Sequence, residues 1–236
     1  HVYVGAVEYA AGEPTPIEQA VTDGALCERL RQASHGAALF ARHDSNIFEL
    51  VEASVRRTLA SGRIDASEVD AVFFVSNMLD AQNNLDTAWL GAINARLGLN
   101  HASHYHVGIT GCGGFHWAAR LAAGLIASAD CERILIVSFD KAGGTLERVY
   151  GQGTDFLYVT GDAAASCIVS SDDRGMNYQL IGKVVNLYDG AQILTPSMDS
   201  EIRTIVRLFG LTYESASITT DDIDFLITNN YSLEIS

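Results

Sequence analysis

The sequence has few basic residues, no closely spaced cysteines and no long apolar run. Its 15 lysines and arginines are outnumbered by 29 aspartates and glutamates, which gives a formal net charge of −14. Because proteins that bind a phosphate backbone carry a basic stripe, this balance argues against a nucleic-acid partner. No run approaches the roughly 20 apolar residues of a membrane span, and residues 1–10 lack the pattern of a signal peptide. These absences predict a cytoplasmic protein with no membrane partner.

The four cysteines, Cys27, Cys112, Cys131 and Cys167, lie far apart and form no CxxC pair. That spacing supports neither a zinc site nor a disulfide framework. We therefore expect reduced thiols in a reducing compartment and no metal site. The hydrophobic fraction of 48% in a chain of 236 residues is enough to build a substantial core.

Strand-like and helix-like stretches alternate along the chain. Apolar residues at helical spacing, or small residues all round, predict helices at 46–62, 87–99, 114–129 and 198–211. Short apolar runs predict strands at 2–10, 69–77, 103–110, 131–140, 161–172, 178–190 and 223–227. The stretch Glu-Pro-Thr-Pro at 13–16 is expected to break the first strand. This order indicates an α/β protein with a largely buried sheet.

One pattern occurs twice. Residues 66–78 (ASEVDAVFFVSNM) and 219–231 (TTDDIDFLITNNY) share an acidic approach, a Val/Ile-Asp pair, an apolar run and then Ser/Thr-Asn. The repeat predicts two similar α/β halves, with residues 1–200 as the first and residues 201–236 as the start of an incomplete second.

Three motifs follow one another in a fixed order: TGCGGFHWAA at 110–119, TGDAAASCIV at 160–169 and IDFLITNNYS at 223–232. In this order they resemble the β-ketoacyl-ACP synthase III family, whose counterparts read AxCxGFxxAL, GDGAGAxxL and IDWLxPHQAN. The resemblance implies a thiolase-like fold of duplicated α/β halves, layered α-β-α-β-α, with the second half truncated here. It also implies an acyltransferase of fatty-acid or specialised, polyketide-type metabolism. Such an enzyme takes an acyl-CoA or an acyl carrier protein thioester as substrate, uses no cofactor and forms a homodimer by pairing sheet edges around the strand before Cys112.

Cys112 is the expected nucleophile. A cysteine at the amino end of a helix meets the positive end of the helix dipole and unpaired backbone N–H groups, which favour the thiolate. The glycines at 111, 113 and 114 leave room for a thioester carbonyl and for N–H groups directed at its oxygen. We expect Cys112 to attack an acyl thioester and to hold the acyl group. The alternative is that Cys112 only fills space in the core, as we expect of the other three cysteines.

The third motif departs from the family pattern. Asn229 stands where the family has a His, and no histidine lies beyond His116. An amide donates a hydrogen bond but transfers no proton near neutral pH, so Asn229 is a candidate to stabilise an oxyanion, or else a turn residue. His106 and His116 are candidates to replace the missing base, although a structural role is the simpler interpretation of each. Glu234 replaces a family arginine that docks an acidic carrier, which disfavours such a carrier unless a basic patch forms locally.

Three interpretations follow. The first is an acyltransferase that loads an acyl group on Cys112 and passes it to a carbon, oxygen or nitrogen nucleophile. The second is a non-catalytic or half-active partner subunit of a heteromeric ketosynthase-like complex. The third is a condensing enzyme whose base lies outside these 236 residues. The sequence does not identify which acyl group is transferred. Four aromatic residues are candidates to line an acyl channel, but packing in the core explains each of them equally well: Trp89, Phe115, Trp117 and Phe156.

Overall fold

The computed structural model describes residues 2–21, 23–33, 38–76, 87–108, 113–142, 148–150, 157–173, 178–179 and 198–223. By their internal contacts the residues form two compact units, His1–Leu180 and Ile181–Ser236. The sequence repeat predicts a different boundary, between residues 200 and 201, where one duplicated half ends and the next begins. The division into contact units does not test that boundary, so it stays a prediction.

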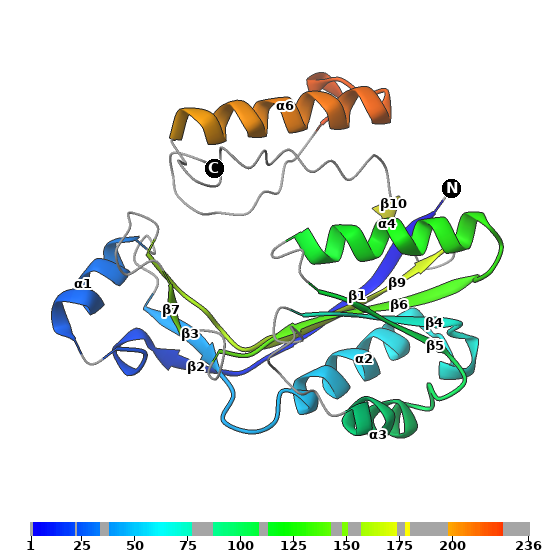
Figure 1. The fold of residues 1–236 in the computed structure, drawn as a ribbon, viewed down its shortest axis with the longest axis horizontal. Helices are drawn as coiled ribbons and strands as arrows, with labels where there is room; N and C mark the ends of the chain where they lie inside the picture. The colour runs from blue at the N-terminus through cyan, green and yellow to red at the C-terminus, as the bar shows by residue number, and fades with distance from the viewer. Residues whose placement is uncertain are drawn as a thin grey trace. The chain divides into compact units, whose positions relative to one another are not determined.

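The first unit is built on a six-stranded mixed sheet with the strand order β10-β1-β9-β6-β4-β5 (Figure 1). Its strands are β1 (Tyr3–Ala11), β4 (Ala71–Val75), β5 (Ser103–Val107), β6 (Arg133–Asp140), β9 (Ala163–Ser170) and β10 (Tyr178–Gln179). β4 pairs in parallel with β5 on one side and β6 on the other, whereas β9 pairs antiparallel with both β6 and β1. The α/β class predicted from the sequence is confirmed.

Helices cover both faces of this sheet (Figure 1). The helices concerned are α2 (Phe48–Gly62), α3 (Thr87–Leu97) and α4 (Gly114–Ala127). Val72 and Phe74 of β4 point into the apolar cluster shared with α2 and α3. Ala71, Phe73 and Val75 point the other way, into the cluster shared with α4. Because successive side chains alternate between two covered faces, every residue of β4 is buried, which explains its uninterrupted apolar sequence.

The first strand ends at Ala11, directly before the stretch that was expected to break it. Residues 13–16 are nevertheless a strand of their own, β2 (Glu13–Pro16), which pairs antiparallel with β3 (Leu39–Arg42). Two prolines are tolerated because β2 belongs to a sheet of only two strands, where one edge of each strand needs no partner.

A helix that the sequence pattern did not predict, α1 (Gly24–Ala33), lies beside these strands. The Asp23 carboxylate accepts hydrogen bonds from the backbone N–H groups of Ala25 and Leu26, which satisfies two donors of its first turn. A second two-stranded sheet pairs β7 (Val149–Tyr150) with β8 (Tyr158–Val159). A separate small apolar cluster joins α1, β3, β7 and the start of β8.

The described part of the second unit is α6 (Met198–Ala216), followed by a 3₁₀ turn at Thr220–Asp222. Helix α6 contains the predicted helix at 198–211 and extends beyond it. Among the residues that the structure describes, no helix is long and apolar enough to cross a membrane.

The sequence repeat has a structural counterpart at the ends of α2 and α6. The residue after each helix is left-handed, with φ of 52° at Arg63 and 56° at Ser217. Two residues later, Asp65 and Thr219 each cap a 3₁₀ turn through a reciprocal pair of hydrogen bonds with the acidic residue three positions on. The two segments therefore share a helix end, a left-handed residue and a capped turn in the same order.

Gly12 brings β1 and β3 into close contact, and we expect Gly12→Ala to destabilise the first unit. A Cβ atom at this position would lie 2.3 Å from the carbonyl carbon of Arg42, so the backbone of β3 would have to move. The expected loss is about 1–3 kcal/mol, measured by urea unfolding. Gly124→Ala is the matched control, because nothing lies within 4 Å of its Cβ position in α4. That substitution should stabilise by about 0.5–1 kcal/mol, and an equal effect of both substitutions would contradict the prediction.

Candidate functional site

The carboxyl ends of three parallel strands meet at one edge of the sheet. Ser76 follows β4, Gly108 follows β5 and Asp140 ends β6. The Ser76 hydroxyl donates a hydrogen bond of 2.9 Å to the Asp140 carboxylate across this edge. In α/β sheets ligands bind outside the carboxyl ends of the strands. Cys112 follows β5 by five residues in the chain, which assigns it to the connection that leaves this edge.

Helix α4 begins immediately after that connection. It starts at Gly114, and Gly113 at its N-cap makes no side-chain hydrogen bond to the first turn. Its buried face contains Ala118, Ala119 and Ala122, which pack against the sheet. The prediction of a helix after the cysteine is therefore confirmed, but the expected burial on every side is wrong, because Leu121 and Gly124 are exposed on its other face. The first backbone N–H groups of α4 have no side-chain cap.

The predicted catalytic residues Cys112 and Asn229 lie outside the described residues, as does Glu234. Their roles stay predictions, and the structure does not test whether they come together. Of the two candidate bases, His116 is exposed on α4, where its ring meets the Phe115 ring edge to face at 5.7 Å. His106 is exposed on β5.

The aromatic candidates for an acyl channel divide in the same way. Phe115 and Trp117 are partly buried and pack against the apolar cluster beneath α4, which favours a packing role. The side chain of Trp89 and the whole of Phe156 lie outside the described residues.

Asp162, in the motif TGDAAASCIV, is a buried residue with many hydrogen bonds, a hub whose role the sequence pattern does not predict. Its side chain is fully buried and receives two hydrogen bonds from the Arg148 guanidinium, at 2.8 and 3.1 Å. The backbone N–H groups of His43 and Ala142 donate to the same carboxylate at 2.7 and 2.8 Å. Burial alone raises the pKa of a carboxyl, but these donors and the positive charge of Arg148 outweigh it and hold the pKa of Asp162 below its ordinary value.

The backbone of Asp162 is bound as well. Its carbonyl accepts from Gly12 and its N–H donates to Ala41, both at 2.9 Å. One residue therefore joins the start of β2, the end of β3, the segment after β6 and the start of β7. The sequence signal for this hub was the Gly-Asp pair immediately before a strand of small residues.

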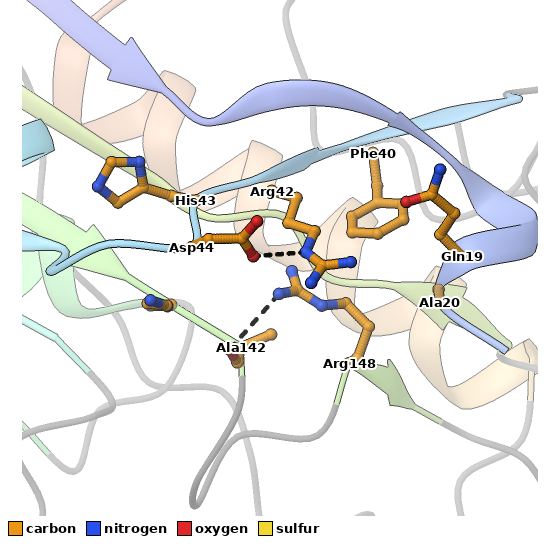
Figure 2. A pocket seen from close by; sticks show the side chains of 9 residues that line it. Gln19, Ala20, Phe40, Arg42, His43, Asp44, Ala142 and Arg148 are labelled. Atoms are coloured by element: carbon orange, nitrogen blue, oxygen red, sulfur yellow. Dashed lines mark hydrogen bonds and ion pairs between the residues drawn. The ribbon is translucent and has the colours of Figure 1, made fainter.

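A pocket of about 350 Å³ lies beside this hub (Figure 2). Its lining comes from the segment before α1, from β3 and the residues after it, and from the segments on both sides of residues 143–147: Gln19, Ala20, Phe40, Arg42, His43, Asp44, Lys141, Ala142 and Arg148. Arg42 forms an ion pair with Asp44 at 2.7 Å, and the Arg148 guanidinium lies 5.0 Å from the centre of the Phe40 ring. Three cationic side chains and one acidic side chain thus line a pocket in a strongly acidic chain.

This gathering of positive charge has no local signal in the sequence. Arg42 lies about a hundred positions from Lys141 and Arg148, and the three side chains meet only because β3 and the end of β6 both bind Asp162. Arg42 is paired with Asp44 and Arg148 with Asp162, so two of the three cations of this lining already have a carboxylate partner.

Comparison with known proteins finds similar sequences and similar folds. The family model for 3-oxoacyl-[acyl-carrier-protein (ACP)] synthase III matches residues 109–186. The mycobacterial β-ketoacyl-[acyl-carrier-protein] synthase III of Mycobacterium tuberculosis is 25% identical over 201 residues, which is 80% of this chain and 55% of that protein. The chain thus spans little more than half the length of the curated relatives that it matches.

Solved structures match over more of their length. ChlB3, an acyltransferase, superposes with a TM-score of 0.79 at 18% identity, over 99% of this chain and 76% of that one. A 3-oxoacyl-(acyl-carrier-protein) synthase III superposes with a TM-score of 0.70 at 17% identity, over 94% of this chain and 76% of that one. These likenesses show an α/β fold of the thiolase type. Over residues 109–186 the chain is therefore similar to the β-ketoacyl-ACP synthase III family, and its fold is similar to that of the solved synthase III structures.

Proposed function

We propose that the chain is the cysteine-bearing part of an acyltransferase of the ketoacyl synthase III type. The Cys112 thiolate attacks the carbonyl carbon of an acyl thioester, and a new carbon–sulfur bond forms as the donor's carbon–sulfur bond breaks. The donor thiolate leaves with the electron pair and takes up a proton. The acyl group then passes from Cys112 to a carbon, oxygen or nitrogen nucleophile in fatty-acid or polyketide-type metabolism. The observation that carries this proposal is the position of Cys112 between the carboxyl end of β5 and the uncapped start of α4.

Asn229 supplies a hydrogen bond to the oxyanion in this proposal. Its amide N–H₂ group is a donor, and the developing negative charge on the thioester oxygen accepts from it. Because an amide does not transfer a proton near neutral pH, this assignment fits acyl transfer better than a step that needs a base at that position.

The pocket beside Asp162 supports a phosphate-bearing donor such as acyl-CoA. Arg42, Lys141 and Arg148 line this pocket, and a phosphate of coenzyme A that entered it would meet the Lys141 ammonium and those guanidinium N–H groups that Asp44 and Asp162 do not bind. A phosphopantetheine-bearing carrier protein is the other donor of the same chemistry. The net charge of −14 opposes long-range attraction of an acidic carrier, so local contacts would have to provide it.

A homodimer that pairs sheet edges is part of the proposal. Among the residues that the structure describes, β5 is the last strand of the sheet, and its first four residues are exposed. An edge strand with unpaired backbone groups is a template for a further strand. We also propose a cytoplasmic, reducing setting, in which the thiol of Cys112 remains free to react.

Acylation of Cys112 by acyl-CoA tests the function. We expect incubation with a series of acyl-CoA thioesters to add one acyl mass to the chain, which peptide mass spectrometry locates on Cys112. Cys131 and Cys167 are internal controls: burial raises the pKa of the Cys167 thiol to about 12. Burial, together with the charges of Asp70 and Asp130, also raises the pKa of Cys131. Both thiols should therefore stay unmodified.

Two other results would contradict the proposal. Acylation of the control cysteines as well as Cys112 would show that acyl-CoA reacts non-specifically with thiols, with no selective site at Cys112. A chain that acquires no acyl group from either acyl-CoA or acyl carrier protein would favour the non-catalytic partner subunit.

A further inference from the structure

One carboxylate stands at the carboxyl edge of the sheet, on the side that α4 covers. In β6, Ile134 and Ile136 pack in the apolar cluster beneath α4. Side chains two apart in a strand point to the same face, so Asp140, the last residue of β6, also points to that side. The next residue agrees, because Lys141 donates to the Ser45 carbonyl in the segment that leads into α2, which covers the other face.

Helix α4 begins at this same edge. β4, β5 and β6 are parallel, so β6, the strand after α4, starts again at the opposite edge from the end of β5. The crossover therefore runs from the carboxyl edge back to the amino edge, and Gly114, the first residue of α4, lies at the carboxyl edge. Because only Gly113 separates Cys112 from this start, the proposed nucleophile is assigned to the edge and the face that carry Asp140.

Small side chains surround this carboxylate on its face of the sheet. Antiparallel pairing places Ala163 of β9 directly beside Asp140, and Ala11 of β1 beside Ala163. The neighbouring row of β6 and β9 pairs Ser138 with Ala165. The three alanines are exposed and Asp140 is half-buried, so none of these neighbours covers the carboxylate. A molecule that reaches this face can therefore approach it.

The Ser76 hydroxyl orients the carboxylate from the neighbouring strand. Ser76 is only 3% exposed, and its hydroxyl donates the 2.9 Å hydrogen bond to one oxygen of Asp140. A carboxylate accepts at both of its oxygens, so a carboxylate oriented in this way can still take a proton from a second donor.

Neither of the two histidines considered as bases is placed as well as Asp140. His106 follows the same two-residue period as His104, whose ring lies 6.3 Å from the Phe74 ring on the α2 and α3 side. His106 therefore points away from the α4 side. His116 is exposed and is not among the residues that α4 packs against the sheet. Asp140 is the better candidate to take up a proton beside the nucleophile.

We propose that Asp140 is the general base of the second half of the reaction, an inference that rests on the proposed acyltransferase. A hydroxyl or amine of the acceptor loses its proton to the Asp140 carboxylate as its oxygen or nitrogen bonds to the carbonyl carbon of the acyl group on Cys112. The tetrahedral intermediate then collapses, the carbon–sulfur bond breaks, and Cys112 leaves with the electron pair as a thiolate. Asp140 releases its proton to solvent before the next turnover. Loading of Cys112 needs no base in this scheme, because the thiolate itself attacks.

Single-turnover release of the acyl group from the full chain tests this role. The chain is loaded with the acyl-CoA that acylates Cys112 most completely, freed of excess donor by gel filtration, and followed by intact-mass spectrometry in water containing ethanol. We expect Asp140→Asn to load at the parent rate and to release its acyl group to water and ethanol at least about 10²-fold more slowly. Hydroxylamine, a strong nucleophile that is largely unprotonated at neutral pH, should remove the acyl group from parent and variant at similar rates.

Asp130→Asn is the matched control. Asp130 also accepts a hydrogen bond from a serine hydroxyl, that of Ser128, but it lies after the far end of α4. This variant should load and release the acyl group as the parent does.

The outcomes separate failure of this inference from failure of the proposed function. Release from Asp140→Asn at the parent rate overturns the base and leaves the acyltransferase standing. Equal slowing with hydroxylamine also overturns it, because the effect is then structural. If Asp140→Asn does not load, Asp140→Glu decides: a base role requires the restored carboxylate to recover release to ethanol as well as loading. A parent chain that acquires no acyl group on Cys112 overturns the proposed function, and this inference with it.

Discussion

Cys112→Ala should lower the acyl-transfer kcat/KM by a factor of about 10³ or more, because the substitution removes the atom that forms the covalent intermediate. Release of coenzyme A, followed with a thiol-reactive dye, measures the loss. The effect should appear in kcat rather than KM, since the side chain contributes to bond formation and little to donor binding. Cys112→Ser should also be severely impaired, because a hydroxyl at the same position ionises far less readily than a thiol.

Cys131→Ala is the matched control for this substitution. Cys131 is a partly buried thiol after the far end of α4, and its loss should change the rate by less than about twofold. A Cys112→Ala chain that retains its rate would remove the nucleophile from the proposal and leave the fold without its assigned chemistry. Equal losses in both variants would indicate that stability, not catalysis, was measured.

The elements predicted correctly from the sequence are those whose pattern is local. The apolar run of β4 and the helical spacing of α2 are set by burial on both faces or on one face, so a short window of sequence contains the signal. Helix α1 was missed because few of its residues are buried, and its start depends on the Asp23 side chain. The pairing of β2 with β3 was missed because two prolines in four residues usually indicate a break.

The candidate site, like the fold, was predictable only where its sequence pattern is local. The motif around Cys112 was recognisable because it is contiguous, and its helix was placed correctly. The pocket was not recognisable, because Arg42 and Lys141 meet through Asp162, a residue that binds backbone atoms from three distant segments. Contacts of this kind depend on which segments pair in the folded chain, and no periodicity in the sequence records them.

Asp162→Ala should destabilise the first unit by about 3–5 kcal/mol. The carboxylate is fully buried, and its removal leaves the Arg148 guanidinium without its bidentate partner and two backbone N–H groups without an acceptor. Urea unfolding measures the loss. Asp44→Ala is the control: Asp44 also pairs with an arginine at 2.7 Å, but its side chain is 78% exposed, so the expected cost is only about 0–1 kcal/mol.

The same carboxylate should make stability depend on acid pH. Because the folded-state pKa of Asp162 is lowered, its contribution is fully present above the unfolded value of about 3.9 and is lost as the pH falls through the lower, folded value. The parent chain should therefore lose stability below about pH 4 more steeply than Asp162→Ala does. A variant with the same acid slope as the parent would assign that slope to other carboxylates.

A double-mutant cycle with Arg148 separates the ion pair from the backbone hydrogen bonds. Arg148→Met alone leaves a buried carboxylate with only the N–H groups of His43 and Ala142, so it should cost several kcal/mol and raise the pKa of Asp162. Adding Asp162→Ala to Arg148→Met should cost much less than Asp162→Ala costs in the parent, because no unpaired guanidinium remains. Strictly additive losses would mean that the two side chains stabilise the pocket independently. In that case the backbone hydrogen bonds alone fix the position of Asp162, and the positions of Arg42, Lys141 and Arg148 around the pocket do not depend on the Asp162 carboxylate.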